Sequence, residues 1–367
     1  MEWYELLNES QIDSPVLLVY PERIEKNIER MINIAGDPER LRPHVKTHKM
    51  AEIVKAQMHR GIRKFKCATI AEAEMLAQCD VPDVFLAYQP VGPKIQRLLT
   101  LIQTYPHTQF SALVDNPEVV RQISDLLSAT DLTLPLYTDL DVGMHRTGIA
   151  PDNTALQLIR AIEETSGLQF AGLHLYDGHL GSVDPASRSA LTDTIWENIH
   201  VLIDMIRSEG FQVPNIIAGG TPSFPYHAKR PNVELSPGTV LLWDYGIELT
   251  CPDLPFESAA VLLTRVVSKP ANDTVCLDLG TKAVASEMPP PRAIFPRLPE
   301  AKVVMHNEEH LVLQSGHARE LTVGQCLYAI PWHICPTVAL HAEVGVVDQG
   351  HVKGTWAVVA RARKLTV

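Results

Sequence analysis

A short basic stretch near the start of the chain, RPHVKTHKM at positions 42–50, carries side chains that could do chemistry. Arg42, His44 and Lys46 alternate along it, so they would share one face of an extended segment. For a lone lysine, a solvated surface position is the better explanation by about four to one, because lysine is rarely buried. A lysine grouped with other cations at the mouth of a barrel has a depressed pKa and is suited to forming a Schiff base with a carbonyl group. Lys46 is therefore our first candidate for a catalytic residue.

Two loops rich in small residues, GGTPS (219–223) and SPGT (236–239), could bind a phosphate group. Small residues allow backbone N–H groups to approach phosphate oxygens closely. Either loop alone could be an ordinary turn at about even odds. Together with a Schiff-base lysine, they match what pyridoxal 5′-phosphate requires of a protein. We therefore expect this cofactor, bound covalently to Lys46.

His333 and Cys335 lie two residues apart in PWHICPTVAL (331–340). Residues two apart share a face of an extended segment, and Pro336 favours an extended conformation at Cys335, so both side chains could bind one metal ion. In isolation, such a pair would be a buried histidine and cysteine about nine times in ten. If the pair binds a metal, the soft thiolate favours zinc over magnesium or manganese.

The elements that must position these residues are strands and helices that alternate between residues 41 and 240. The eight predicted strands are residues 41–45, 64–69, 83–88, 110–115, 133–140, 168–176, 214–220 and 232–235. Most gaps show helical spacing, and Asn116 followed by Pro117 predicts the start of one helix. The gap 221–231 is too rich in proline for a helix. We predict a (β/α)8 barrel with catalytic groups at the C-terminal ends of its strands.

A second domain is predicted from the change in sequence pattern after Gly246. Short β-rich runs are separated there by Pro, Gly and Asn, and no long helical period is present. The run SPVLLVY (14–20) is a further strand that has no place among the eight of the barrel. We predict a barrel domain of residues 21–246 and a mainly antiparallel β domain of residues 1–20 plus 247–367 that carries the metal site.

The composition narrows the class of partner. With 46% hydrophobic and 20% charged residues the chain is typical of a globular protein, and its net charge of −11 argues against a nucleic acid or an anionic membrane surface. No apolar run reaches the roughly 18 residues of a membrane span, and the start MEWYELLNES does not have the pattern of a signal peptide. The six cysteines form no CxxC pair and fit reduced thiols. We expect a cytoplasmic protein that binds a small molecule.

Four motifs resemble those of the D-threonine aldolase and D-serine dehydratase family: RPHVKTHK (42–49), DVGMHRTG (141–148), GLHLYDGH (172–179) and PWHICPTVAL (331–340). These are fold-type III pyridoxal-phosphate enzymes, distantly related to the alanine racemases. The resemblance covers essentially the whole chain. It implies a homodimer that acts on small D-amino acids.

The resemblance also assigns roles to single residues. It implies that Lys46 holds the cofactor, that Arg146 contacts its ring oxygen and that Tyr176 packs near its ring face. The GGTPS loop and the backbone of the SPGT loop would cradle the phosphate. The complete cofactor-binding set is Lys46, His44, Arg146, Tyr176, Gly219, Gly220, Thr221, Gly238 and Thr239.

Two reactions of a β-hydroxy-D-amino acid are compatible with this site. If Lys46 removes the α-proton while zinc polarises the β-hydroxyl, water leaves and a 2-oxo acid and ammonia form. If a base takes the β-hydroxyl proton instead, the Cα–Cβ bond breaks and gives glycine and an aldehyde. His179 is a candidate for that base, and a structural role is at least as good an explanation for it.

The metal motif bears on the choice between these reactions. His333 and Cys335 fall where the family binds its divalent metal. Dehydratases of the family have His-x-Cys at that position and aldolases have His-x-Asp, so the motif favours the dehydratase. The following residues, PTV (336–338), are more similar to the aldolases, and both reactions stay open.

Three alternatives of other kinds remain. A racemase would use the same barrel, but it needs a second acid or base, usually a tyrosine from the β domain, and no matching motif is found. A non-catalytic pyridoxal-phosphate carrier is a single barrel, so the residues after Gly246 count against it. A sugar-phosphate enzyme built on a barrel would have no lysine-bound chromophore.

Overall fold

The computed structural model describes residues 2–367, which form two compact units. One unit consists of Met31–Lys46, Val54–Gly238 and Ala362–Val367 and is called the barrel unit below. The other consists of the residues up to Arg30, Thr47–Ile53 and Thr239–Arg361 and is called the β unit. Over residues 2–367 no helix combines the length and the apolar character that crossing a membrane requires.

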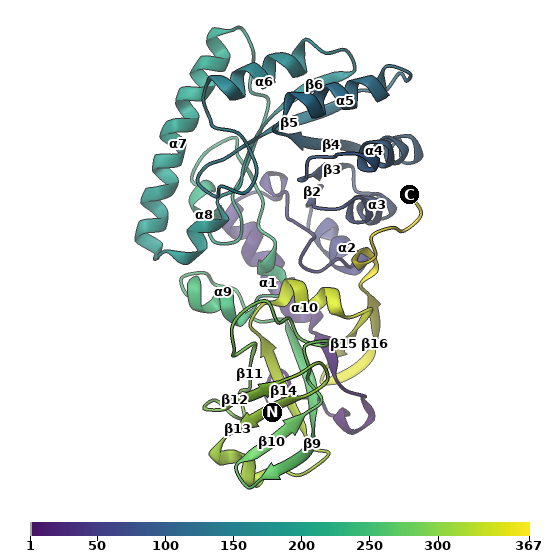
Figure 1. Cartoon of the computed structure of the whole chain (residues 1–367), viewed down its shortest axis with the longest axis vertical. Coiled ribbons are helices and arrows are strands. Elements are labelled where there is room, and N and C mark those ends of the chain that lie inside the picture. Colours follow the sequence, from purple (N-terminus) through teal and green to yellow (C-terminus); the bar gives the residue numbers. More distant parts are fainter. Residues whose placement is uncertain (1) are drawn as a thin grey trace. The chain divides into compact units, whose positions relative to one another are not determined.

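The barrel unit is built on a parallel sheet of seven strands in sequential order (Figure 1). The strands are β2 (Lys64–Cys67), β3 (Asp83–Leu86), β4 (Gln109–Val114), β5 (Leu134–Leu140), β6 (Leu168–Leu175), β7 (Ile216–Ala218) and β8 (Glu234–Leu235). Most of their residues are buried, as expected for strands covered by helices. The predicted alternation of strands and helices is confirmed.

The first predicted strand, residues 41–45, closes the sheet without forming a regular strand. Leu41 makes a parallel bridge to Leu235 in β8, and His44 makes one to Lys66 in β2. Pro43 interrupts the ladder because it has no N–H to donate, although its carbonyl accepts a hydrogen bond from the Lys66 N–H at 3.0 Å. The segment therefore joins the two edge strands and completes the barrel.

Helices follow most strands of the barrel unit and cover the outside of its sheet (Figure 1). They are α3 (Ile70–Gln78), α4 (Pro93–Thr104), α5 (Pro117–Leu127), α6 (Asn153–Glu163), α7 (Pro185–Ser208) and the four-residue α8 (Phe224–His227), while α1 (Pro21–Ala35) and α2 (Ala51–His59) contain residues of both units. The predicted cap is confirmed, because the Asn116 side chain accepts a hydrogen bond from the Glu118 N–H. The prediction that the proline-rich gap 221–231 contains no helix was wrong over the four residues of α8, because Pro225 lies in the first helical turn, where proline is tolerated.

Arg42 does not join the catalytic cluster that the alternating pattern predicted. Its guanidinium is 1% exposed and donates to both carboxylate oxygens of Asp83, at 2.6 and 2.8 Å, and to Glu234 at 2.6 Å. Asp83 and Glu234 are the first residues of β3 and β8, so this ion network lies at the N-terminal end of the barrel strands. The network therefore joins the closing segment to β3 and β8 and stabilises the barrel, and it takes no part in chemistry at the C-terminal ends of the strands.

The β unit contains a mainly antiparallel sheet of nine strands. They are β1 (Val16–Val19), β9 (Ala260–Ala271), β10 (Thr274–Leu277), β11 (Ala293–Ile294), β12 (Lys302–His306), β13 (Leu311–Gln314), β14 (Cys326–Pro331), β15 (Glu343–Asp348) and β16 (His351–Ala357). The predicted N-terminal strand is confirmed as β1, which pairs antiparallel with β9 and parallel with β15. The exact domain boundaries at residues 20 and 246 stay a prediction.

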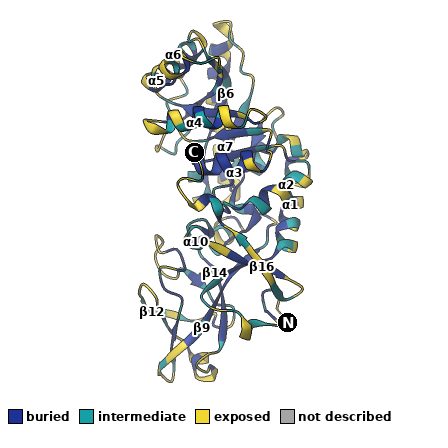
Figure 2. Ribbon diagram, turned by 90° about the vertical axis from the view of Figure 1, so that its right-hand side faces the viewer, coloured by how far each residue is buried: buried dark blue, intermediate teal, exposed yellow. Residues whose placement is uncertain are grey.

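One hydrophobic cluster of the β unit lies on one face of β1, β9 and β14. Its buried members are Tyr4, Leu6, Leu18, Tyr20, Val261, Leu263, Cys326, Tyr328 and Val347. By contrast, β12 is exposed along much of its length (Figure 2). Two short helices, α9 (Tyr245–Thr250) and α10 (Ile334–Leu340), complete this unit.

Candidate active site

Lys46 follows the segment that closes the barrel, at the C-terminal end of the strands. Its backbone N–H donates to Nδ1 of the buried His44 at 3.2 Å, so His44 fixes the turn that carries the lysine. The Nζ atom of Lys46 lies 5.5 Å from the centroid of the Tyr176 ring. The position is the one in which catalytic groups of such barrels occur.

Tyr176 is the meeting point of the predicted cofactor residues in the barrel unit. Besides Lys46, the guanidinium carbon of Arg146 lies 4.8 Å from the ring centroid. A third cation, which the sequence did not lead us to expect, approaches the same ring: Lys66 Nζ is 5.7 Å from the centroid. Three basic side chains around one ring make this end of the barrel suited to an anionic ligand.

Lys66 is held by a buried chain of hydrogen bonds. Its Nζ lies 2.7 Å from His174 Nε2, and His174 Nδ1 lies 2.6 Å from Asp139 Oδ1. The carboxylate can only accept, so His174 carries its proton on Nδ1, and Nε2 accepts from Lys66. All three side chains are buried, with Lys66 3% exposed.

The protonation of this chain follows from its burial and its charges. Burial, followed by the positive charge of Lys46, lowers the pKa of Lys66 to about 7, although Asp139 opposes the shift. Burial and the charge of Lys66 also lower the pKa of His174. Burial acts to raise the pKa of Asp139, but its hydrogen bond and charge interaction with His174 lower it overall. At neutral pH, Asp139 is therefore a carboxylate, His174 is a neutral imidazole, and Lys66 is near the midpoint of its titration.

Lys66, His174 and Asp139 are residues that sequence reasoning missed, although a signal was present. Each is an ionisable residue within a predicted strand, and the structure places each as the second-to-last residue of its strand, β2, β6 or β5. In a buried parallel strand such a residue faces either the covering helices or the inside of the barrel, and only the second environment offers polar partners. Polar residues near the ends of several strands could have been grouped on that basis.

The two predicted phosphate loops meet in the barrel unit. The Gly238 N–H donates to Thr221 Oγ1 at 3.2 Å, which joins the loop after β8 to the loop after β7. Gly219 has a φ of +80°, and a Cβ there would lie 2.7 Å from His227 Cδ2. A Cβ on Gly220 would lie 3.1 Å from the Tyr176 ring. Small residues are therefore required where the loops pass the tyrosine, in agreement with a cradle for a ligand.

A buried carboxylate, Asp177, fixes the shape of the first of these loops. Ser223 Oγ donates to Asp177 Oδ1 at 2.5 Å and accepts the Gly220 N–H at 3.1 Å. Trp196 Nε1 donates to His227 Nδ1, so His227 carries its proton on Nε2 and donates it to Asp177 Oδ2 at 2.8 Å. Serine, histidine and aspartate also form nucleophilic triads, but here the aspartate bonds both partners and Ser223 is fully buried. The group is a brace for the loop.

His179, the candidate second base, lies in a short helical turn two residues after Asp177. A Cβ on Gly143 would lie 3.1 Å from His179 Nε2, so the ring packs beside the loop that carries Arg146. Its Nδ1 is buried and has no hydrogen-bond partner among residues 2–367. A buried polar atom without a partner marks a position where a water or a ligand could bind.

The predicted metal ligands come together in the β unit, but in a different conformation from the one predicted. Residues Ile334–Leu340 form helix α10, so Cys335 lies in its first turn and only His333 is extended. Pro336 fits that first turn because its missing N–H would have no helical partner there. The expectation of an extended segment at Cys335 was therefore wrong, although the two side chains are hydrogen-bonded to each other.

The surroundings of this pair are polar. Glu287 Oε1 lies 2.5 Å from His333 Nδ1, which leaves the other ring nitrogen of His333 for the thiol, and Thr47 Oγ1 lies 3.1 Å from Cys335 Sγ. Burial lowers the pKa of His333, but the hydrogen bond and charge of Cys335 raise it to about 9 overall. Burial raises the pKa of the Cys335 thiol, but the interaction with His333 lowers it overall. Within the described part of the chain, no three His, Cys, Asp or Glu side chains are grouped to hold an ion.

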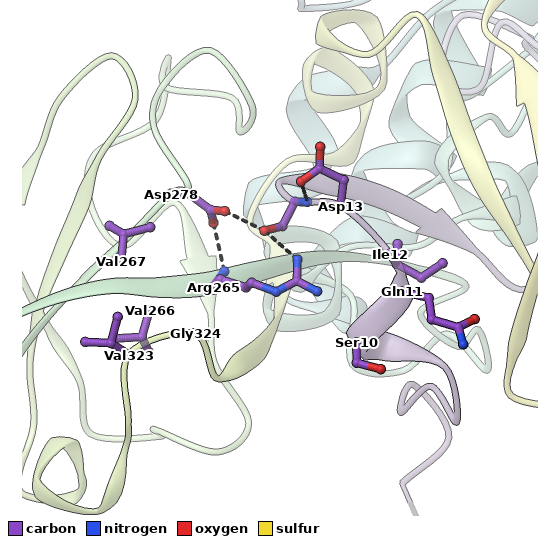
Figure 3. A pocket seen from close by; sticks show the side chains of 11 residues that line it. Ser10, Gln11, Ile12, Asp13, Arg265, Val266, Val267, Asp278, Val323 and Gly324 are labelled. Atoms are coloured by element: carbon purple, nitrogen blue, oxygen red, sulfur yellow. Dashed lines mark hydrogen bonds between the residues drawn. The ribbon is translucent and has the colours of Figure 1, made fainter.

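A cleft of about 620 Å³ in the β unit lies outside all of the predicted motifs (Figure 3). Its polar groups bond to one another: Asp278 accepts from Ser14 Oγ at 2.5 Å and from the Arg265 N–H at 2.8 Å, while the Arg265 guanidinium donates to Ser14 and Glu9. These bonds connect the N-terminal segment to β9 and β10. The cleft therefore offers structural contacts rather than groups directed at a ligand.

Comparison with known protein families gives two matches in succession along the chain. Residues 19–245 match the family described as “Alanine racemase, N-terminal domain”. Residues 259–347 match the family described as “Putative serine dehydratase domain”. The first match alone spans more than half of the 367 residues.

Individual relatives include aldolases, dehydratases and alanine racemases. The chain is 30% identical over 360 residues to a D-threonine aldolase of Arthrobacter sp, covering 96% of this chain and 93% of that protein. It is 25% identical over 217 residues to a D-threo-3-hydroxyaspartate dehydratase of Delftia sp. (strain HT23), covering 58% and 56%. The solved structure of D-threonine aldolase from Filomicrobium marinum matches with a TM-score of 0.88 at 26% identity and covers 96% of both chains. The predicted resemblance and fold class are confirmed.

Proposed function

The chain belongs to the family of the alanine racemase N-terminal domain and is a pyridoxal-phosphate-dependent lyase for β-hydroxy-D-amino acids; we propose that it is a dehydratase, with Lys46 as the cofactor lysine. The convergence of Lys46 and Arg146 on the Tyr176 ring, beside two glycine-containing loops, is the observation that carries the cofactor site, and the His333–Cys335 pair is what favours the dehydratase. The products are a 2-oxo acid and ammonia.

The residues at this end of the barrel fit pyridoxal phosphate. The cations around Tyr176 match its negative charges, Gly219 and Gly220 are small where the first loop passes its neighbours, and the Gly238 N–H joins the second loop to the first. When bound, the cofactor accepts the electron pair that a substrate releases at Cα. The remaining proposed contacts are those of His44, Thr221 and Thr239.

Lys46 has two roles in this proposal. Its amine holds the cofactor before the substrate arrives, and afterwards Nζ removes the proton from Cα of the substrate. The hydrogen bond from its own backbone N–H to His44 keeps the turn in place while the side chain changes partner. Because Lys46 would remove the proton on one face of the cofactor, only one configuration at Cα can react, and the similarity to lyases of D-amino acids leads us to expect the D-form.

We further propose that His333 and Cys335 bind a divalent metal, with zinc the best match for one imidazole and one thiolate. Glu287 orients His333 through Nδ1, as carboxylates commonly do for metal-binding histidines. An ion held by these two residues would supply a Lewis acid, the group that polarises a hydroxyl in a dehydration. Thr47, whose hydroxyl contacts Cys335, follows Lys46 directly in the chain. A variant of a D-threo-3-hydroxyaspartate dehydratase has been solved in a metal-free form, which supports metal binding in that protein.

D-threonine aldolase activity, which gives glycine and an aldehyde, is the second candidate. It is favoured by the full-length similarity to the Arthrobacter aldolase, whereas the Delftia dehydratase aligns over 58% of this chain. The proposed ligand Cys335 favours the dehydratase, because the motif resemblance implies His-x-Cys for dehydratases and His-x-Asp for aldolases. His179 is our candidate for the base that this second reaction requires.

A substrate panel distinguishes the two reactions. D-Serine, D-threonine and 3-hydroxy-D-aspartate, with their L-forms, would be incubated with the purified protein, and ammonia and glycine measured separately. We expect ammonia and a 2-oxo acid from at least one D-substrate. Glycine with an aldehyde as the main product would establish the aldolase. Equal turnover of both enantiomers of one substrate would favour a racemase instead.

Lys46 is tested by chemical labelling. We expect borohydride to fix the cofactor on Lys46, and Lys46→Ala to abolish turnover and the visible absorption of the lysine-bound cofactor. Lys55→Ala removes an exposed lysine of α2 and should leave both unchanged. A labelled peptide that contains Lys66 instead would refute the assignment, and this is a real alternative because both lysines lie close to Tyr176.

We also propose a cytoplasmic homodimer. All six cysteines are free in the structure, which fits a reducing compartment. Light scattering of the purified protein would test the dimer, which rests on the family resemblance.

A further inference from the structure

Lys66 is the one basic group at the Tyr176 site for which the proposed reaction has no use. It is 3% exposed, projects from β2 and reaches the ring on which Lys46 and Arg146 also converge. A buried lysine without a full counter-charge is costly, and proteins rarely keep one. Its presence in the barrel therefore requires an explanation.

The charges around Lys66 do not balance in the free protein. Asp139 reaches it through the neutral His174, and Asp177, the other nearby carboxylate, bonds His227 and Ser223. Lys46 and Arg146 add two positive charges. A multiply charged anion placed beside Tyr176 would reverse this imbalance and favour the ammonium form of Lys66.

The hydrogen-bond chain supports both forms of the lysine. His174 Nε2 accepts one N–H from Nζ, and both the amine and the ammonium have an N–H to donate. Asp139 holds the imidazole in the tautomer that accepts, so Nζ keeps its position whether or not it carries the additional proton. This is the geometry expected of a group that changes charge without moving.

We propose that Lys66 is a proton-accepting residue of the cofactor site, which is partly neutral in the free protein and becomes fully protonated when the anionic cofactor binds beside Tyr176. The proposal rests on the proposed function, because that function supplies the anion. Its consequence is that cofactor binding takes up a proton and is stronger at lower pH. Lys66 thus carries its full positive charge when the anionic cofactor is bound and only part of it when the site is empty. We assign it a positioning role rather than a catalytic one.

The charged and titratable groups around Lys66 set its pKa and therefore the number of protons that it can take up. They are Lys46 from the closing segment, Asp139 at the end of β5, Arg146 from the following loop, His174 in β6, and Tyr176 and Asp177 after β6. Burial and the first of these lower the pKa of Lys66 to about 7, so about half a proton is available for uptake at neutral pH.

Calorimetry with an unreactive cofactor analogue measures this uptake. 4-Deoxypyridoxine 5′-phosphate lacks the aldehyde, so it cannot react with Lys46. It would be titrated into cofactor-free full-length protein at pH 7 in buffers of different ionisation enthalpy, which gives the number of protons bound per ligand. We expect the wild type to take up about half a proton more than Lys66→Met, because the proton changes of the analogue itself are common to both.

Two further variants complete the experiment. Lys66→Arg keeps the positive charge but cannot lose it, so it should bind the analogue within a few-fold of the wild type without the additional proton. Lys94→Met is the matched control, because Lys94 also lies over a tyrosine ring, Tyr88, at 4.2 Å, but outside the barrel site. Its proton uptake should equal that of the wild type.

The outcomes separate this inference from the proposed function. Equal uptake in the wild type and in Lys66→Met would refute the role of Lys66 and leave the cofactor site intact. Failure of the wild type to bind both the analogue and pyridoxal phosphate would overturn both proposals. If Lys66→Met does not fold, NMR of lysine labelled with ¹³C at Cε in the wild type decides, since the proposal requires the pKa of Lys66 to rise on addition of the analogue.

Discussion

Asp177 is the buried carboxylate that braces the loop after β7, and Asp177→Asn tests whether this brace serves the cofactor. The wild-type carboxylate accepts hydrogen bonds from Ser223 Oγ at 2.5 Å and from His227 Nε2 at 2.8 Å. Through Ser223 it also fixes the Gly220 N–H. An asparagine has the same shape but presents only one acceptor atom, so one of the two donors must lose its partner.

The expected cost follows from these contacts. A hydrogen bond to a charged acceptor contributes about 1.5–3 kcal/mol, and a buried donor without a partner costs about 1–3 kcal/mol. Because the amide keeps one weaker bond, we expect the free energy of unfolding to fall by about 2–4 kcal/mol. If the loop must be ordered to bind the phosphate, the Kd of the cofactor should rise about 10- to 100-fold, which corresponds to about 1.4–2.8 kcal/mol.

Two measurements check this prediction on the same samples. Urea denaturation of the cofactor-free protein gives the change in stability, and titration with pyridoxal phosphate, followed by its absorption, gives the Kd. Asp184→Asn is the matched control, because Asp184 also accepts from a serine hydroxyl, that of Ser187 at 2.5 Å, but is exposed at the start of α7. A lower stability with an unchanged cofactor Kd would show that the brace supports the fold alone and would refute our reasoning about the loop.

Three further predictions concern other parts of the chain. Glu287→Gln should weaken metal binding about 10- to 100-fold without affecting cofactor absorption, measured by competition with a chelator, because the amide orients His333 less firmly. Arg42→Met should lower the free energy of unfolding by about 3–5 kcal/mol because it removes the ion-pair partner of Asp83 and one of the two partners of the buried Glu234, whereas Arg121→Met at an exposed ion pair should change it by less than about 1 kcal/mol. Burial lowers the pKa of His48 to about 3, so between about pH 6.5 and pH 3 the unfolded chain binds a proton that the folded protein does not. The contribution of His48 to the free energy of unfolding is therefore fully present above about pH 6.5 and is lost as the pH falls towards 3. Acid titration of the free energy of unfolding should show a less steep decrease in His48→Asn.

The barrel could be predicted because its signals are local. Each strand is a short apolar run, and residues such as Asn116 and Pro117 mark a helix start by their own chemistry. The first strand was harder to predict, since whether LRPHV forms a regular strand depends on Pro43 and on partners from β2 and β8 that are distant in sequence. The conformation at Cys335 depends on its neighbours in the same way: Pro336 is compatible with an extended segment and with a first helical turn, and the sequence alone does not choose between them.

The candidate site was predictable where a residue belongs to a recognisable motif. Lys46, Arg146 and Tyr176 were found in this way, and they converge in the structure. Lys66 and Asp177 were not found, because their significance lies in partners from other strands and loops. Arg42 shows the opposite error: its motif suggested chemistry, but its partners are carboxylates at the other end of the barrel strands.

The β unit is discontinuous in sequence, and this limits how it can be exchanged between relatives. The chain passes from one unit to the other between Lys46 and Thr47 and again between Gly238 and Thr239. The hydroxyls of Thr47 and Thr239 lie 3.1 and 3.7 Å from Cys335 Sγ, so they belong to the surroundings of the metal motif. A single crossover after residue 246 would transfer the motif and leave both threonines behind. Recombination at one point is therefore a poor route to a new metal preference, and gradual substitution at several separate positions is the route that the fold permits.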